Sequence, residues 1–473
     1  MAQIYTTIRK TQEVVSLKEN AHYIGLLLFI ALMYLRNLVG ISISPVLLLV
    51  FYVVLEVRAK DVSELFALML STLVWTSAFQ YKYALLAGIL VYFVKFGNSI
   101  KANSTIIPIL LLFAWEVLHA VYGEFSFSEY LRSMTEWAVL LVVLNTNKSR
   151  LNVSLIVRTV VISTTFTILL LLLVTLLRSG DGLSLLFSGS FRLGWDYNNY
   201  YQATYDSYLG TASSYSLVYN PNTLGMICAI CISGLLICRF SGDKRKLDMA
   251  FFGLLLSFGL LTISRNFLLT FFCLGVFALW AERVRFETVL KMLFGLFAAA
   301  FLVALLLPEQ VEAVFASFSN RIVGSEDISG GRIDLLSIYG NILFSDQTVL
   351  FFGTGLQNPL EVLQQLGWTP FSVPHNSTQQ LFVVWGIPGF ILLLATLITA
   401  IRNLSCGLKL NYSFIMLFVV LFATQSGQLV TSGSAMLGLS LALLCLLLSA
   451  GTDLSSSVGM QKSNDGDGQA NRR

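Results

Sequence analysis

Long apolar stretches separated by short polar ones recur along the whole chain, as in residues 168–177, 251–261 and 390–397. A helix needs about 20 mostly apolar residues to cross about 30 Å of hydrocarbon. By this criterion the pattern predicts an all-α polytopic integral membrane protein with about 12–14 transmembrane helices. The candidate segments are 22–35, 38–56, 64–80, 83–95, 105–121, 133–145, 153–177, 220–239, 249–263, 266–281, 291–307, 376–400, 411–427 and 431–450.

The composition supports a membrane protein. Hydrophobic residues make up 56% of the chain and charged residues 12%, with a mean hydropathy of +0.76, whereas soluble domains are about 25% charged. If the N-terminus lies inside and the helices alternate, most of the 30 Lys and Arg fall in cytoplasmic segments, as the positive-inside rule requires. We therefore expect both termini in the cytoplasm. This bias explains the net charge of +4, so no nucleic-acid partner is implied, and the basic loops could contact anionic membrane lipids.

Two segments interrupt the series of apolar helices. A Tyr-rich segment covers 178–219, and a longer one covers 308–375, with a helix over 332–345 and another that begins at Pro359 and ends at Gly367. Loops of this length are usually functional or disordered, and we expect 308–375 to be a large helical external loop that carries the active site. The predicted divisions are 1–177, N-terminal transmembrane helices; 178–219, external Tyr-rich loop; 220–307, central transmembrane helices; 308–375; 376–450, C-terminal transmembrane helices; and 451–473, disordered cytoplasmic tail.

Several common kinds of chemistry lack their motifs in this chain. It has no P-loop, no G-x-G-x-x-G opening a helix after a strand, and no H-E-x-x-H. No cluster of Asp, Glu or His in the predicted external loops has the spacing of metal ligands. We therefore expect no cofactor, no metal and no ATP-driven work by the chain itself.

Arg265 is the first candidate functional residue. Met249 to Trp280 would measure about 48 Å as one helix, and basic clusters flank both ends, so a tight external turn is expected at Ser264-Arg265-Asn266. An arginine at a span centre costs roughly 2.5–3.5 kcal/mol. Arg265 should therefore reach the outer interface or a wet cavity, either as a lipid anchor or as a ligand for an anionic substrate.

Arg332 and His375 complete the predicted external site. Arg332 follows Gly330-Gly331 and opens a helix, where an anionic partner would offset the unfavourable dipole; pairing with Asp327 or Asp334 is the alternative. His375 lies in a Pro374-His375-Asn376 step where the long loop re-enters an apolar helix. It could serve as a general base at neutral pH or as an ordinary polar residue of the interface.

These motifs, taken in order, resemble those of a known family. The stretch from Gly331 to Leu336, the Gly353-Thr354-Gly355-Leu356 turn, and His375-Asn376 followed by Trp385-Gly386-Ile387-Pro388-Gly389 are similar to the signature loop of the bacterial O-antigen polymerase and O-antigen ligase superfamily. Ser264-Arg265, Arg192-Leu193 and Asn220-Pro221-Asn222 resemble further motifs of that family. The resemblance covers roughly residues 190–400.

The resemblance implies an inverting, metal-independent glycosyltransferase on the external face of the bacterial inner membrane. Its donor and acceptor would be polyprenyl-diphosphate-linked oligosaccharides, carried on undecaprenyl diphosphate. Arg265 and Arg332 would hold the diphosphate, with Arg192 and Asn376 as further substrate-binding residues, and His375 would activate the acceptor hydroxyl. A chain-length regulator and a flippase would be candidate protein partners in lipopolysaccharide or exopolysaccharide synthesis.

The sequence leaves the acceptor open. A polymerase adds the growing chain to another lipid-linked repeat unit, and this is the function we expect. A ligase, which transfers the chain to lipid A core, would share the same arginines and histidine. A non-catalytic transporter or lipid-linked glycan flippase is the second alternative, and it would depend on Glu116, His119 and Arg158 within the spans.

Overall fold

A computed structural model describes residues 23–35, 43–75, 81–122, 127–178, 182–187, 193–194, 220–281, isolated positions between 287 and 319, 332–356, 359–370, 374, 376–404, 417 and 435–447. These residues form helices and turns, with one isolated antiparallel bridge between Ile100 and Thr146. The labelled α-helices are α2 (Pro45–Arg58), α3 (Val62–Thr72), α4 (Tyr81–Phe96), α5 (Ile106–Tyr122), α6 (Phe127–Leu144), α7 (Val153–Arg178), α9 (Pro221–Phe240), α10 (Lys246–Leu261), α11 (Arg265–Ala281), α14 (Arg332–Ser345), α15 (Gln347–Phe352), α16 (Pro359–Gln365) and α17 (Ser377–Leu404).

Three helices of the described chain are long and apolar enough to cross a membrane, and they are Val153–Leu177, Pro221–Phe240 and Ser377–Leu404. Six further apolar helices are shorter, including Tyr23–Leu35 and Ala435–Leu447. The helix predicted over 64–80 is shorter in the structure, because α3 ends at Thr72 and its 11 residues measure only about 16 Å. Nearly all of α3 is buried by its neighbours, so it is a core helix. The total number of spans stays a prediction.

Local signals give several helix boundaries correctly. Asn220 caps α9, its side chain accepting a hydrogen bond from Asn222 N–H, and Pro221 occupies the first helical position. The predicted helix 332–345 is α14, and the predicted start at Pro359 is that of α16. Gly367, which follows α16, has a φ of +90°, a conformation that suits glycine at the end of a helix.

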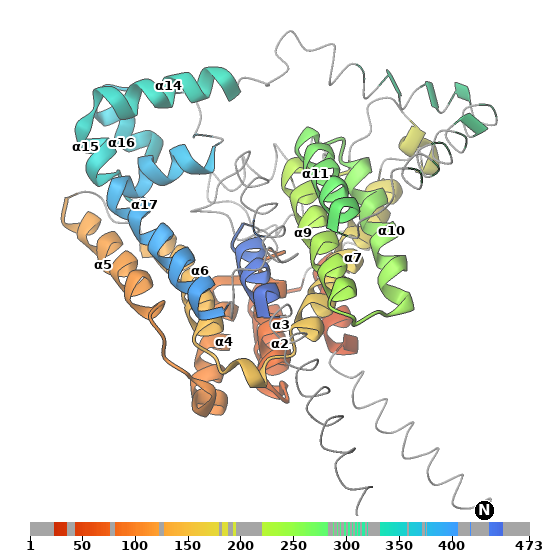
Figure 1. Cartoon of the computed structure of the whole chain (residues 1–473), viewed down its shortest axis with the longest axis horizontal. Coiled ribbons are helices and arrows are strands. Elements are labelled where there is room, and N and C mark those ends of the chain that lie inside the picture. The colour runs from red at the N-terminus through yellow and green to blue at the C-terminus, as the bar shows by residue number, and fades with distance from the viewer. Residues whose placement is uncertain are drawn as a thin grey trace, which may run out of the picture.

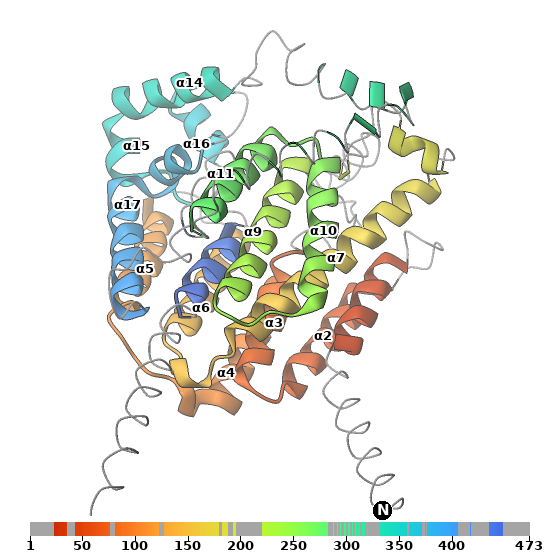
Figure 2. The same cartoon turned by 45° about the vertical axis from the view of Figure 1, so that its right-hand side comes forward.

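The helices form one body with a smaller group of helices at its upper end in Figures 1 and 2. Most helices run up and down through the body, and α14, α15 and α16 lie above α5 and the descending part of α17. The small group has its own apolar core, formed by Leu335, Tyr339, Ile342, Leu343, Val349, Leu363 and Val383. Among the apolar residues of α14, Tyr339, Ile342 and Leu343 are buried in this core, whereas Ile333 and Leu336 are 67% and 48% exposed.

The opposite end of the body carries basic turns that hydrogen bonds join together. The turn after α2 meets α4, because Lys95 Nζ donates to Val57 O at 3.0 Å and to Ala59 O. Arg150 donates to Asn98 Oδ1 at 3.2 Å, and Lys148 donates to Asn403 O at the end of α17. If the helices alternate in direction as predicted, the basic clusters after α2, before α7 and at the end of α17 belong to one side of the membrane. In the structure these segments lie together.

Arg158 is the buried cation of α7, and two aspartates from the α9–α10 region surround it. Its Nε and Nη2 donate to the two carboxylate oxygens of Asp248 at 3.0 and 2.8 Å, and its Nη1 donates to Asp243 Oδ2 at 2.7 Å. Asp248 is buried, whereas the Asp243 side chain is 41% exposed. Arg158 therefore joins α7 to α10 as a fully paired structural charge.

We expect Arg158→Met and Asp243→Asn to differ strongly in stability. Removing Arg158 leaves the Asp248 carboxylate buried without a counter-charge, which costs roughly 3–5 kcal/mol. Asp243 is partly solvated, so Asp243→Asn should cost at most about 1 kcal/mol. Thermal unfolding of the purified variants in detergent measures both values, and equal losses would contradict this account of the ion cluster.

The effect of Asp243→Asn should also depend on pH. The hydrogen bond from Arg158 holds the pKa of Asp243 below its ordinary value. A lowered carboxyl pKa gives stability that is complete above the unfolded-state value, about pH 4, and is lost as the pH falls through the folded-state pKa. The stability difference between the wild type and Asp243→Asn should therefore be present at neutral pH and vanish in acid.

Candidate functional site

The turn between α10 and α11 is as tight as the charge pattern predicts. Three residues, Thr262–Ser264, separate the end of α10 at Leu261 from the start of α11 at Arg265. Ile263 has a φ of +47°, which is an outlier for a β-branched side chain and stores strain of order 1–3 kcal/mol. Such strain persists only where the surrounding structure holds the turn in place.

Packing and hydrogen bonds from distant segments supply this support. Leu193 N–H donates to Leu261 O at 2.9 Å, and the Ser264 hydroxyl donates to Asn222 Oδ1 at 3.1 Å. Gly225 lets α9 approach closely, since a Cβ there would lie 3.0–3.2 Å from atoms of the turn and of Phe267. The segments around Leu193 and Asn220–Asn222, which the family resemblance singled out, therefore meet at the turn that carries Arg265.

Arg265 itself keeps unused hydrogen-bonding capacity. It is half-buried at the first position of α11. Its Nη1 is buried and has no hydrogen-bond partner among the described residues. A buried guanidinium donor without a partner is costly, so the geometry calls for an acceptor that the described residues do not provide.

A second cluster surrounds a break within α17. Gly386 has φ 64° and ψ −162°, and Pro388 lies two residues further on inside the helix. The first part of α17 runs crosswise and the second part descends through the body (Figure 1). The break frees the carbonyl groups of Val383 and Val384 from their usual helical donors, because Gly386 is not helical and proline has no N–H.

Donors from other segments satisfy these carbonyl groups. Thr354 N–H donates to Val383 O at 2.7 Å, and Gly355 N–H donates to Val384 O at 2.8 Å. Within α17, the Trp385 carbonyl accepts a hydrogen bond of 2.9 Å from the Trp115 indole of α5. The turn Gly353–Leu356, which we name the glycine turn, is therefore hydrogen-bonded directly to the α17 break.

Two glycines make this pairing sterically feasible. A Cβ on Gly353 would lie 2.4 Å from Val384 O, and a Cβ on Gly386 would lie 2.7 Å from Phe351 O. Both residues have positive φ, 77° and 64°, so a side chain would be strained as well as crowded. The two glycine-containing motifs of the family resemblance are thus halves of one contact.

Glu116 and His119 of α5 connect the glycine turn to the α17 break. Glu116 Oε1 accepts from Leu356 N–H at 2.9 Å, and Oε2 accepts from the Trp385 indole N–H at 2.8 Å. His119 Nε2 lies 2.8 Å from Phe352 O and its Nδ1 lies 3.8 Å from Glu116 Oε2. Both ionisable side chains are therefore engaged in holding separate segments together.

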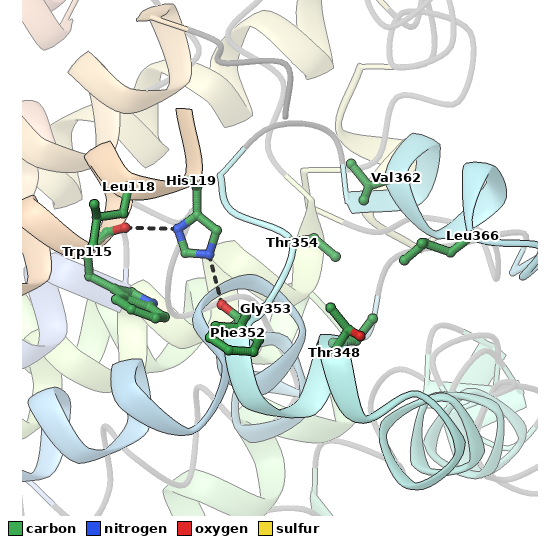
Figure 3. A pocket seen from close by; sticks show the side chains of 10 residues that line it. Trp115, Leu118, His119, Thr348, Phe352, Gly353, Thr354, Val362 and Leu366 are labelled. Carbon is green, nitrogen blue, oxygen red and sulfur yellow. Dashed lines mark hydrogen bonds between the residues drawn. The ribbon is translucent and has the colours of Figure 1, made fainter. Parts of the chain in front are cut away.

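A pocket of about 450 Å³ lies beside this contact, between α5, α15, the glycine turn and α16 (Figure 3). Its lining is mostly apolar. The lining residues are Trp115, Leu118, His119, Thr348, Val349, Phe352, Gly353, Thr354, Val362 and Leu366.

The remaining predicted site residues are described only in part. Arg332 is the first residue of α14, although its side chain lies outside the description. Asn376 caps α17, because its Oδ1 accepts from the N–H groups of Thr378 and Gln379 at 3.0 Å each. His375 and Arg192 lie outside the described residues. Of the predicted set, Arg265 is thus described as a side chain with an unfilled donor and Asn376 as a helix cap.

The described residues place no group of three or more His, Cys, Asp or Glu where it could hold a metal ion. Comparison with protein-family models, with curated proteins and with solved structures finds no significant match for this chain. The functional argument therefore depends on the geometry of the chain itself.

Sequence reasoning did not find the roles of Glu116, Trp115 and Trp385. Glu116 and His119 stood out as ionisable residues three apart in an apolar helix, but no local signal indicates a partner about 240 residues away. The Trp-Gly-Ile-Pro-Gly motif does carry a readable signal, since glycine and proline together predict a helix break. Its Gly389 leaves room for Trp385, whose Cβ would be only 2.1 Å from a Cβ at 389.

We expect Gly386→Ala to be severely destabilising, whereas Gly340→Ala should be neutral or stabilising. At Gly386 the added methyl meets Phe351 O and the backbone conformation is unfavourable, a combination that costs about 3 kcal/mol or more. Gly340 lies within α14 with nothing within 4 Å of the new Cβ, so alanine should gain about 0.5–1 kcal/mol. Thermal unfolding monitored by size-exclusion chromatography compares them, and similar melting temperatures would refute the close contact.

Proposed function

We propose that this chain is an integral membrane polysaccharide polymerase. It transfers a glycan from a polyprenyl-diphosphate donor to a lipid-linked repeat unit on the external face of the cytoplasmic membrane. The observation that carries the proposal is the Arg265 guanidinium, whose buried Nη1 has no partner among the described residues and lies at a strained turn. Strain and an unfilled buried donor both favour a functional role over a purely structural one.

The arrangement of helix starts supports an anionic substrate. Helix α11 begins at Arg265, α14 begins at Arg332, and α17 begins directly after Asn376. The α10–α11 turn, α14 and the first part of α17 all lie at the upper end of the body in both views (Figures 1 and 2). Helix N-termini carry partial positive charge and free N–H groups, and two of these three begin with arginine. A diphosphate matches this combination.

The proposed chemistry is an inverting displacement at the anomeric carbon. His375 takes the proton of the acceptor hydroxyl, whose oxygen forms the new bond to the anomeric carbon. The bond from that carbon to the diphosphate oxygen breaks, and the diphosphate leaves with the electron pair. Arg265 and Arg332 neutralise the charge that develops on the leaving group, which is the role that fixed cations perform best. The amide nitrogen of Asn376 is free of described partners, so it can donate to the substrate.

The two alternative functions, a ligase and a transporter or flippase, make different demands on the ionisable residues. An O-antigen ligase would use the same arginines and histidine with lipid A core as the acceptor. A transporter or flippase would need ionisable groups available along a pathway in the midplane. Its candidates are engaged elsewhere, because Arg158 is paired with Asp243 and Asp248, and Glu116 and His119 hydrogen-bond to the backbone. This engagement favours the transferase.

Arg265→Lys should lower the rate of glycan transfer by about 10- to 100-fold, since one charge-assisted hydrogen bond contributes about 1.5–3 kcal/mol. Lysine keeps the charge but loses the planar fork that binds two oxygens. The matched control is Arg245→Lys, because Arg245 lies in the exposed α9–α10 region. Purified variants are assayed with lipid-linked repeat units. Wild-type activity in Arg265→Lys would mean that Arg265 acts as a lipid anchor or a simple point charge.

His375→Ala should abolish polymer formation while leaving the membrane level and the melting temperature of the protein unchanged. Asn376→Ala is a useful comparison because it removes a helix cap, which costs about 1 kcal/mol. The glycan is analysed by gel electrophoresis after complementation of a deletion strain. Normal chain lengths in cells that express His375→Ala would exclude this histidine as the general base.

A further inference from the structure

We propose that the pocket beside α5 binds one hydrocarbon chain of a membrane lipid, which enters from the face of α5 that the other helices leave uncovered. The proposal relies on the membrane embedding of the chain but does not depend on the glycosyltransferase activity. It concerns the ten residues that line the pocket in Figure 3.

The size and lining of the pocket suit an apolar ligand. Its volume of about 450 Å³ falls within the range of about 300–1,000 Å³ that is usual for small-molecule sites. Leu118, Val349, Phe352, Val362 and Leu366 provide aliphatic and aromatic walls from three separate segments. Leu366 and Phe352 are about half exposed, so covering them with an apolar chain is favourable.

Two polar side chains of the wall, His119 and Thr354, already contact backbone carbonyl groups. His119 Nε2 faces Phe352 O at 2.8 Å and its Nδ1 faces Trp115 O at 3.0 Å (Figure 3). The Thr354 hydroxyl donates to Val383 O at 3.0 Å. A ligand headgroup would find neither of these side chains free, whereas a hydrocarbon chain makes no such demand. The chemistry of the pocket therefore selects the apolar part of a lipid.

The uncovered face of α5 leads into the pocket. Ile107, Leu111 and Leu118 repeat at helical spacing, and all three are exposed large hydrophobic residues. In a membrane-spanning helix such a face contacts lipid chains. Leu118, the last of the three, also lines the pocket, so the pocket is continuous with the surface that lipid would cover.

A hydrocarbon chain bound in this pocket would contact the glycine turn directly. Phe352, Gly353 and Thr354 form part of its wall, and the backbone N–H of Thr354 holds the α17 break. The chain could belong to a polyprenyl lipid or to a bilayer phospholipid, since both offer the same aliphatic chemistry. The experiment separates these two sources.

Photo-crosslinking tests the proposal without requiring enzymatic activity. The full-length protein is reconstituted in nanodiscs with a diazirine-bearing phosphatidylglycerol or with a diazirine-bearing polyprenyl phosphate, and adducts are mapped by peptide mass spectrometry. The key variant is Leu118→Trp, whose indole fills the mouth of the pocket. The control is Leu111→Trp, which makes the same change on the same face of α5, at a residue 51% exposed against 49% for Leu118.

The expected result is labelling of the peptides that contain residues 115–119, 348–354 and 362–366, lost in Leu118→Trp and retained in Leu111→Trp. Labelling by the polyprenyl probe alone identifies a prenyl chain as the ligand, and labelling by the phospholipid probe identifies an acyl chain. Labelling spread evenly over the exposed helix faces, or unchanged in Leu118→Trp, would overturn the proposal. If the protein is labelled by lipid but makes no polymer, the proposed lipid-binding pocket stands and the proposed polymerase function fails.

Discussion

Peptide groups freed by a helix break must find partners, and in this chain that requirement connects segments hundreds of residues apart. Water satisfies such groups in a soluble protein, but the interior of an apolar bundle offers none. The break at Gly386 and Pro388 releases the carbonyl groups of Val383 and Val384, which accept hydrogen bonds from the glycine turn. The glycine turn also needs an acceptor for the N–H of Leu356, and the carboxylate of Glu116 on α5 provides it. Removing any one member leaves the others unsatisfied.

The hydrogen-bond partners of the buried charges distinguish Arg158 and Glu116 from Arg265. Arg158 and Glu116 are both buried, and each has its full set of close partners. Arg265 differs, because contacts from the segment around Leu193 and from the start of α9 hold the strained turn that presents it, while one of its guanidinium nitrogens has no described partner. Arg132 Nε and the carboxylate of Glu56 are also buried without a described partner, but neither lies at a strained turn. The proposed function assigns this unfilled donor at a strained turn to an anionic substrate.

Sequence patterns predicted what depends on neighbouring residues. The bounds of α14, the Asn-Pro start of α9 and the turn before Arg265 follow from caps, proline and charge spacing over a few positions. The short length of α3 was missed, since hydropathy measures apolar content and does not detect where a helix ends. The burial of single residues on α14 is not readable from the sequence either, because α14 is apolar on two faces and tertiary packing selects which face is buried.

The sequence predicted the candidate residues of the site but not the contacts that hold the surrounding segments in place. Arginine and histidine at loop boundaries are visible in the sequence, whereas the contact of Glu116 with Trp385 joins residues 269 positions apart and leaves no local trace. Its mechanical consequence can be derived from the geometry. The first part of α17, from Ser377 to Trp385, is an arm of about 13 Å, with the Asn376 cap at its far end. A rotation of only 10° at the break would move that end by about 2 Å, and displacements of about 1 Å at a reacting group can lower rates about 100-fold. By holding the angle of this arm, a motif rich in glycine and tryptophan therefore positions the Asn376 cap, which precedes α17 and follows the histidine that the proposed function uses as a base.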